Sequence, residues 1–167
     1  MEPLFECRYT RTEAIMKEYL RTTLLLAPFA IALYVLTGYY LIEGIKVWIY
    51  TGQFYPLYLV MVAVLPGFIY YSYRRNLKLM VSRELEQNHG QPFTLHCAVA
   101  QDTLTISGPF GSQENGFDVI QKVKTSKNLI LLYTKSRLVW IFPKDSFTRG
   151  SAGEFLTFLK NKGLKVR

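Results

Sequence analysis

Cysteine and histidine are scarce in this chain of 167 residues, which contains two of each. Cys7 and Cys97 lie far apart and form no Cys-x-x-Cys motif, so the sequence predicts neither a disulfide framework nor a structural zinc site. His89 and His96 flank a Gly-Gln-Pro break and lack the further ligands that a metal pair needs. We therefore expect no metal and no cofactor.

The sequence also lacks the motifs of the common enzyme classes. It contains no P-loop, no Gly-x-Gly-x-x-Gly fingerprint, no His-Glu-x-x-His zinc motif and no nucleophile elbow. His96 falls at a strand position, and the acids Asp102, Glu114, Asp118 and Asp145 show no pairing suited to glycoside hydrolysis. We expect no enzymatic activity and assign no catalytic residue.

Charge is absent from two long apolar runs, residues 24–42 and 54–73. A helix needs about 20 apolar residues to cross the bilayer core, and neither run shows the polar face of an amphipathic helix. We predict a transmembrane hairpin with helices at 24–42 and 54–73 and an external loop at 43–53. Pro28 and Pro66 fall inside these spans and are expected to bend them.

Basic residues flank the hairpin on both outer sides. Arg8, Arg11, Lys17 and Arg21 precede the first span, whereas Arg74, Arg75, Lys78 and Arg83 follow the second. Positive charge favours the cytoplasmic side of a membrane, so we expect a multi-pass protein of the cell (plasma) membrane with both termini cytoplasmic. Arg74 and Arg75 should anchor this topology, and a contact with anionic lipid is a further interpretation.

The segments that flank the spans carry helix and strand patterns of their own. Residues 1–23 begin with an alternating stretch, Phe5 to Tyr9, which we expect to add a strand to the sheet of the C-terminal domain. Thr10 to Glu13 fits a capping box, which predicts a helix that runs into the first span. Residues 74–91 continue the second span as a cytoplasmic helical connector.

The C-terminal domain, residues 92–167, changes to the alternation of β-strands. The pattern predicts a five-strand meander over 93–100, 103–108, 117–126, 129–134 and 137–142, with a loop at 109–116. Pro143 should end the last strand, and Ser146 or Ser151 can cap a helix around 151–162. That helix places Phe155, Phe158 and Leu159 on one face, which predicts a lid on one buried face of the sheet.

The order of these pieces and the exit from the last strand carry a family resemblance. The residues that carry it, in an Ile-x-Pro-Lys-x-x-Phe pattern, are Trp140, Ile141, Pro143, Lys144 and Phe147. The chain resembles the YcxB-like family of bacterial membrane proteins, whose C-terminal domain resembles bacterial pleckstrin-homology (PH) folds. The resemblance implies an α+β fold with a small antiparallel PH-like sheet capped by a helix. It also implies structural roles for Trp140, Pro143, Lys144 and Phe147, with Phe117 as the aromatic of the third strand.

Basic residues outnumber acids by more than two to one from residue 90 onward, and Lys122, Lys124 and Lys127 form the densest local cluster. Such charge suits nucleic acid, an anionic leaflet or a merely solvated surface, and a membrane tether favours the leaflet over nucleic acid. We expect a non-enzymatic membrane-anchored binding module whose partner is the lipid bilayer, its anionic headgroups or a membrane protein. The alternative is envelope protection, such as immunity against a bacteriocin. A channel would require an oligomer, and the oligomeric state stays open.

Overall fold

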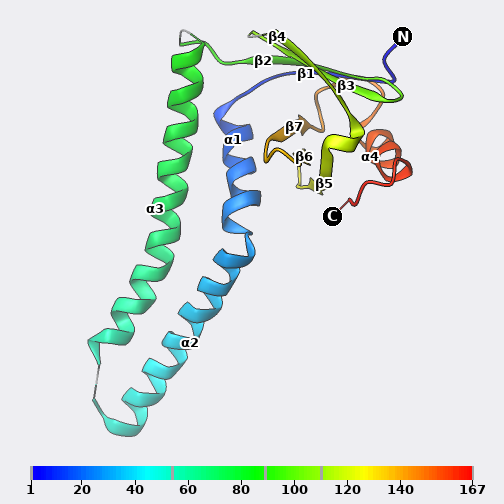
Figure 1. Cartoon of the computed structure of the whole chain (residues 1–167). Helices are drawn as coiled ribbons and strands as arrows, with labels where there is room; N and C mark the ends of the chain where they lie inside the picture. Colours follow the sequence, from blue (N-terminus) through cyan, green and yellow to red (C-terminus); the bar gives the residue numbers. More distant parts are fainter. Residues whose placement is uncertain (1, 54, 89, 110, 167) are drawn as a thin grey trace. The chain divides into compact units, whose positions relative to one another are not determined.

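The computed structural model describes residues 2–53, 55–88, 90–109 and 111–166 (Figure 1). Phe54, which begins the second predicted span, and His89, one of the two histidines considered above, lie outside these residues. The chain divides into two compact units. The first, which we call the β domain, comprises Met1–Tyr19 with Val81–Arg167, and the second, the helical unit, comprises Leu20–Met80.

The helical unit contains two long apolar helices. A π-helical turn, Arg21–Leu25, leads to α2, Pro28–Thr51, and a second helix, α3, covers Pro56–Gln87, its last residues belonging to the β domain. Both helices are long and apolar enough to cross a membrane, and only 6% of the most apolar window of each is buried. Their apolar side chains are therefore largely exposed in the protein alone.

The bounds of α2 differ from the predicted span and loop. The helix continues through residues 43–51, which we predicted as external loop, because no break occurs before Gly52, where φ is +67°. An ion pair of 2.8 Å between Glu43 and Lys46 stabilises this last part. The helical path is interrupted at Leu26 and Ala27, inside the predicted span, and Pro28 begins α2, where proline is favoured, rather than bending it from within. Pro66 does lie inside α3.

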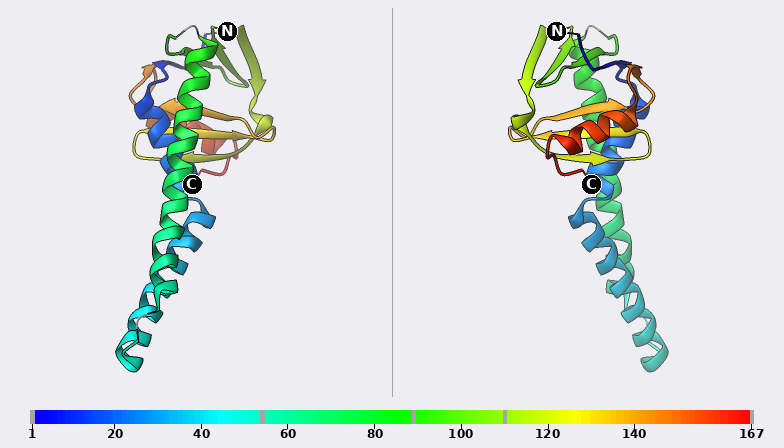
Figure 2. Two further views of the ribbon diagram at one scale, coloured as in Figure 1. Left: turned by 90° about the vertical axis from the view of Figure 1, so that its left-hand side faces the viewer. Right: turned by 90° about the vertical axis from the view of Figure 1, so that its right-hand side faces the viewer.

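The β domain contains two antiparallel sheets (Figure 2). Sheet A has the order β4-β3-β2-β1-β8, with β1 Phe5–Thr10, β2 Thr94–Val99, β3 Thr103–Gly108, β4 Gly111–Gly116 and β8 Phe147–Arg149. Sheet B has the order β5-β6-β7, with β5 Ile120–Thr125, β6 Leu129–Thr134 and β7 Val139–Pro143. Besides the end of α3, the described part of the domain contains the helix α1 Glu13–Leu20, the 3-10 turn Phe117–Val119 and the helix α4 Ala152–Asn161. The fold is α+β, as predicted.

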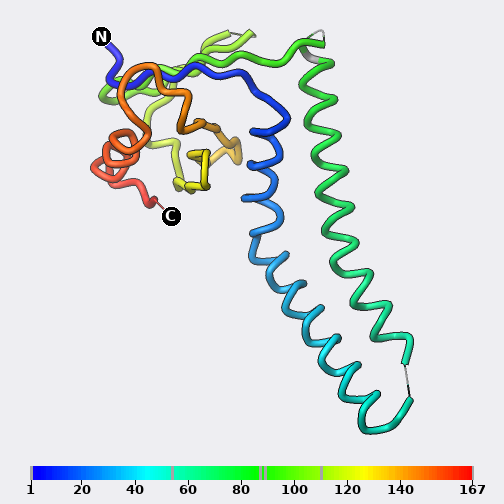
Figure 3. Tube along the Cα trace, turned by 180° about the vertical axis from the view of Figure 1, so that it is seen from behind, coloured from blue at the N-terminus to red at the C-terminus, as the bar shows by residue number. Residues whose placement is uncertain are grey.

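The N-terminal strand β1 lies inside sheet A, between β2 and β8 (Figure 3). It pairs with β2 over its whole length, from Phe5 opposite Val99 to Thr10 opposite Thr94, with Cys7 opposite Cys97. The expectation that this strand joins the sheet of the C-terminal domain is confirmed. The sheet therefore combines strands from before and after the two long helices.

The prediction of one five-strand meander is wrong in its single sheet, in its number of strands and at Phe117–Val119, which forms a 3-10 turn before β5 and not the start of the third strand. Residues 111–116, predicted as part of a loop, form β4, which pairs with β3 from Thr103 opposite Gly116 to Gly108 opposite Gly111. Phe147–Arg149 forms the short β8 beside β1, so the chain returns to sheet A after leaving sheet B. Both are edge strands of sheet A, which are held largely by their backbone hydrogen bonds. They therefore form without the apolar alternation that would have marked them in the sequence.

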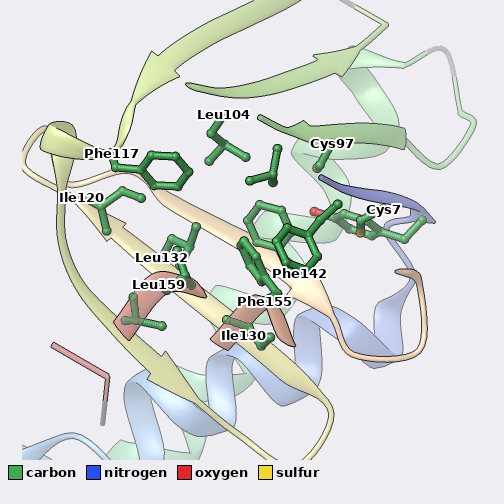
Figure 4. Close-up of a cluster of buried hydrophobic side chains, with 14 residues drawn as sticks. Cys7, Cys97, Leu104, Phe117, Ile120, Ile130, Leu132, Phe142, Phe155 and Leu159 are labelled. Carbon is green, nitrogen blue, oxygen red and sulfur yellow. The ribbon is translucent and has the colours of Figure 1, made fainter. Parts of the chain in front are cut away.

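The main hydrophobic core lies between the two sheets and α4 (Figure 4). Phe155 and Leu159 of α4 are fully buried, and Phe158 packs against the same cluster, as the helical spacing predicted. The ring of Phe155 lies 5.4 Å from Phe5 of sheet A and 5.4 Å from Phe142 of sheet B, measured between centroids. The helix thus joins both sheets. Ser151 caps it in a capping box with Glu154, as anticipated for one of the two candidate serines.

Sheet B is buried on both faces, whereas we predicted a sheet with one buried face. Leu129, Leu131 and Ile141 form a second cluster on the face opposite the main core, and Ile15 and Tyr19 of α1 pack against it. The uninterrupted apolar run of β6 follows from this double burial. Helix α1 begins at Glu13, and its first turn is capped by Thr12, whose hydroxyl accepts from the Ile15 amide at 3.4 Å, rather than by Thr10.

Candidate functional site

Two lysines of the predicted basic cluster lie on β5 and the third lies in the turn that follows, and the three differ in their surroundings. Lys122 and Lys124 flank the fully buried Val123 on β5 and so point to the opposite face of the sheet. The Lys122 ammonium lies 4.8 Å from the ring centroid of Tyr133, and burial raises the pKa of Tyr133 to about 12. Lys124 is half-buried and Lys127 is exposed in the following turn. Lys122 and Lys127 are the more accessible of the three.

The turn that carries Lys127 is held in place by two side chains from elsewhere. Glu18 of α1 accepts from the hydroxyl of Ser126 at 2.5 Å and from the backbone amide and side-chain amide of Asn128 at 2.8 and 2.9 Å. Burial acts to raise the pKa of Glu18, but these hydrogen bonds, together with Lys144, lower it. Lys127 is therefore presented on a fixed turn.

Lys144 contributes to the same turn from the other side. Its ammonium donates to the carbonyl oxygens of Ser126 at 2.6 Å and Lys127 at 3.1 Å. A lysine engaged in this way holds backbone and is not a free cation for a partner. The family resemblance implied a structural role for Lys144. These two hydrogen bonds to backbone carbonyl oxygens are consistent with such a role.

The other residues of the family pattern divide between core and cavity. Pro143 is buried at the end of β7, opposite Leu129, and the ring of Phe147 lies 5.5 Å from Phe155. Trp140 points to the same side of β7 as the fully buried Phe142, but it is only half-buried. Trp140 therefore lines an opening rather than the closed core.

That opening is a cavity of about 420 Å³ at one end of the β domain. It lies over the inner face of sheet A, where β2, β3 and β4 meet, with β7 of sheet B on its other side. Its described lining consists of Arg11, Phe93, Leu95, Ile106, Gly108, Pro109, Gly111, Ser112, Gln113 and Trp140. Sequence reasoning did not find this site, because its residues come from five separate segments.

Arg11 is the one charged residue in the described lining of the cavity. Its backbone amide donates to the Phe93 carbonyl at 2.7 Å, which fixes the chain just after β1. Its side chain bonds Tyr9, whose pKa is raised by burial while Arg11 opposes that rise. The buried Nε of Arg11 has no hydrogen-bond partner among the described residues. The sequence marked Arg11 only as part of the basic flank.

Glu84 is the acid that faces this arginine. Its side chain is 7% exposed, and its Oε1 has no hydrogen-bond partner in the described part of the chain. The two groups attract each other, but no N–O distance between them falls within the 4.0 Å of an ion pair. The Nε of the half-buried Arg11 and the Oε1 of the buried Glu84 are thus both buried atoms whose hydrogen-bonding capacity is unused among the described residues.

The two cysteines are brought together by the pairing of β1 and β2. Cys7 and Cys97 are directly opposite, each is 2% exposed, and both are free thiols. Cys7 Sγ also lies 2.9 Å from the hydroxyl of Ser146. The hydrogen bond between the thiols lowers the pKa of Cys7 and, together with burial, raises that of Cys97. Their burial makes them part of the core.

The remaining candidates lie at the surface. Arg74 and Arg75 are exposed on α3 within the helical unit. His96 is exposed on β2, on the face opposite Cys97. Within the described ranges, no group of three or more histidine, cysteine or acidic side chains is arranged to hold a metal ion.

Residues 99–159 match the family described as YcxB-like protein. The chain carries a YcxB-like domain. The matched segment begins at the last residue of β2, ends in α4, and includes the lysine cluster, Trp140 and Lys144. Strand β1, Arg11 and Glu84 lie outside it. No curated protein and no solved structure matches the chain.

Proposed function

We propose that this protein is a non-enzymatic, membrane-anchored binding module of the cell membrane. Helices α2 and α3 form the anchor, and the YcxB-like domain, with its PH-like sheets and closing helix, is the cytoplasmic binding part. The observation that carries the proposal is the exposure of α2 and α3, whose most apolar windows are only 6% buried. A bilayer would cover that apolar surface, which a monomer in water would leave exposed.

The pairing of β1 with β2 supports a hairpin that returns to its starting side. Strand β1 precedes both long helices and β2 follows them, yet the two strands are bonded along six residue pairs. Strands that share a sheet must lie on the same side of a membrane. Together with the basic residues on both flanks, this supports cytoplasmic placement of both ends.

Cysteine labelling in intact bacterial cells tests the anchor. We expect Gln53→Cys, at the exposed tip of the hairpin, to react with a membrane-impermeant maleimide in intact cells. Gln121→Cys, exposed on β5, should react only after the cells are permeabilised. The unmodified chain is the control, because Cys7 and Cys97 are each 2% exposed and should stay unlabelled. Equal labelling of both positions in intact cells would contradict the proposed topology.

The partner that the charges favour is the anionic surface of the inner leaflet. Lys122 and Lys127 present accessible ammonium groups on sheet B, Lys124 lies between them on β5, and Arg74 and Arg75 are exposed on α3. Each basic residue near an anionic leaflet contributes about 1 kcal/mol of attraction. A domain tethered at that leaflet meets its headgroups before any soluble partner.

Lipid retained by the purified protein tests this contact. We expect the full-length chain, extracted in mild detergent, to keep anionic phospholipid that the Lys122/Lys124/Lys127→Gln variant loses by about half or more, because several attractive charges vanish together. Mass spectrometry of extracted lipid measures the retention. The matched control is Lys135/Lys160/Lys165→Gln, which removes three exposed lysines elsewhere. Equal loss from both triple variants would indicate a general charge effect and refute a specific surface.

A further inference from the structure

The cavity beside Arg11 exists because the inner face of sheet A opens toward one end. Along β3, Leu104 is fully buried, but Ile106 is only half-buried. Along β2, Val99 and Cys97 are buried, but Leu95 is half-buried. These side chains belong to the same face of the sheet, so the core between the sheets gives way to a hollow of about 420 Å³. The hollow is a continuation of the core without side chains to fill it.

The walls of the hollow are mainly apolar. Leu95 and Ile106 form the sheet A side, Trp140 the sheet B side, and Phe93 lies at the start of β2. A Cβ on Gly108 would lie 2.9 Å from Leu95 Cδ2, so glycine at this position leaves room for Leu95 along the wall. A volume within the ~300–1,000 Å³ of small-molecule sites, lined by apolar side chains together with Arg11, Ser112 and Gln113, suits a ligand that has an apolar part and a polar part.

The polar end of the hollow is marked by a cation, because the half-buried Arg11 is one of the residues that line it. The Nε of Arg11 is itself enclosed by protein and has no partner among the described residues, so a ligand would meet the other nitrogens of the guanidinium. A planar guanidinium matches the geometry of a carboxylate or a phosphate group and binds either strongly when water is excluded. An anion with an apolar tail would use both features of the cavity.

We propose that this cavity binds a single-chain amphiphile with an anionic head, the head at Arg11 and the chain against Leu95, Ile106 and Trp140. The inference rests on the proposed membrane anchoring for the supply of its ligand, since a bilayer is the source of such molecules. A fatty acid and a lysophospholipid share this chemistry, with a carboxylate or a phosphate at the head. The carboxylate of Glu84, which faces Arg11, competes with the bound head.

A tryptophan titration tests the proposal on the full-length chain in zwitterionic nanodiscs. The chain has two tryptophans, so Trp48→Phe leaves Trp140 as the single reporter inside the cavity. We titrate octanoate, octyl phosphate, 1-octanol and octylammonium, which share one chain and differ in the head. We expect saturable changes in Trp140 emission, with the anions binding about tenfold or more tightly than octanol and octylammonium.

Paired substitutions separate the contribution of the ligand's head-group charge from that of its alkyl chain. Arg11→Gln should weaken octanoate and octyl phosphate about tenfold, whereas Glu84→Gln should strengthen them, because it removes the competing carboxylate. Ile106→Phe should abolish the signal by filling the cavity. Arg8→Gln is the matched control, because Arg8 is exposed on β1 opposite His96 and points away from the cavity. If Arg11→Gln does not fold, Arg11→Lys and Glu84→Gln still measure how the charge at this end of the cavity affects binding.

Three results would overturn the inference: non-saturable changes with every probe, equal binding of octylammonium and octanoate, or anion binding insensitive to Glu84→Gln and Ile106→Phe. The relative affinities of octanoate and octyl phosphate distinguish a fatty acid from a lysophospholipid. The maleimide labelling described above uses no amphiphile and tests the topology alone. A failure of the proposed topology can therefore be distinguished from a failure of the cavity to bind an amphiphile.

Discussion

Deletion of residues 4–10 is expected to unfold the β domain while α2 and α3 stay helical. The deletion removes β1, which is bonded to β2 on one side and to β8 on the other, and with it the buried Phe5, Cys7 and Tyr9. The loss of three core side chains, each worth about 2–5 kcal/mol, is as large as the about 5–15 kcal/mol that stabilise a domain, and the hydrogen bonds to β2 and β8 are lost as well. Hydrogen exchange of nanodisc-embedded protein measures the effect.

A short deletion supplies the control for this experiment. Removing residues 2–3 eliminates the ion pair between Glu2 and Arg149, whose side chains are 86% and 48% exposed, but leaves β1 intact. An exposed ion pair contributes at most about 1 kcal/mol, so exchange in sheet A should stay slow. If the amides of β2 exchange as slowly in the variant that lacks residues 4–10 as in the intact protein, β1 has no structural role in the domain.

Phe155→Ala is expected to lower the free energy of unfolding of the β domain by about 3–5 kcal/mol. The ring is fully buried and lies within 5.5 Å, between centroids, of the rings of Phe5, Phe142 and Phe147. Alanine would therefore leave a cavity at the point where α4 joins both sheets. The alkylation of Cys7 and Cys97 in increasing urea measures the loss, because both thiols are buried until the domain opens.

Thr157→Ala is the control on the same helix. Thr157 is exposed, and its hydroxyl donates only to the Gly153 carbonyl at 3.0 Å, so the free energy of unfolding should change by less than about 0.5 kcal/mol. If Phe155→Ala has an equally small effect, the helix is not the closing element of the core that we describe.

Much of the fold could be predicted because its signals are local. The apolar runs of the long helices, the alternation of β2 and β3, and the i, i+3, i+4 spacing of Phe155, Phe158 and Leu159 each depend on neighbours in the sequence. The capping box at Ser151 and Glu154 is equally local. Such patterns predict elements, and the structure contains these elements.

The sequence predictions failed where pairing between distant segments determines the secondary structure. Four of the six residues of β4 are exposed, so nothing in its side chains marks a strand, and it forms because β3 supplies hydrogen-bonding partners. The division into two sheets depends on the 3-10 turn Phe117–Val119, where the chain leaves β4 of sheet A before it enters β5 of sheet B, and no local period encodes this change. The helix α2 extended past the predicted loop because Gly44 alone is too weak to end a helix.

The candidate site was the least predictable part. The basic cluster could be found from composition, but the engagement of Lys144 with the 126–128 turn depends on residues far apart in sequence. Arg11 reads as one of several flanking cations, and only the pairing of β1 with β2 places it at the mouth of a cavity. The same pairing brings Cys7 opposite Cys97, which no spacing rule would suggest.

The pairing of β1 with β2 also determines the order in which the protein can be completed. During synthesis β1 emerges first, and its partner β2 begins only at residue 94, after both long helices have been made. Closing so long a loop is entropically costly, and a helical hairpin that returns the chain to its starting side shortens the distance to be closed. A chain whose two long helices did not bring its ends back together would keep β1 apart from β2 and leave unpaired strand edges exposed to aggregation and proteolysis. Completion of sheet A therefore depends on the correct folding of the helices that lie between its strands in the sequence.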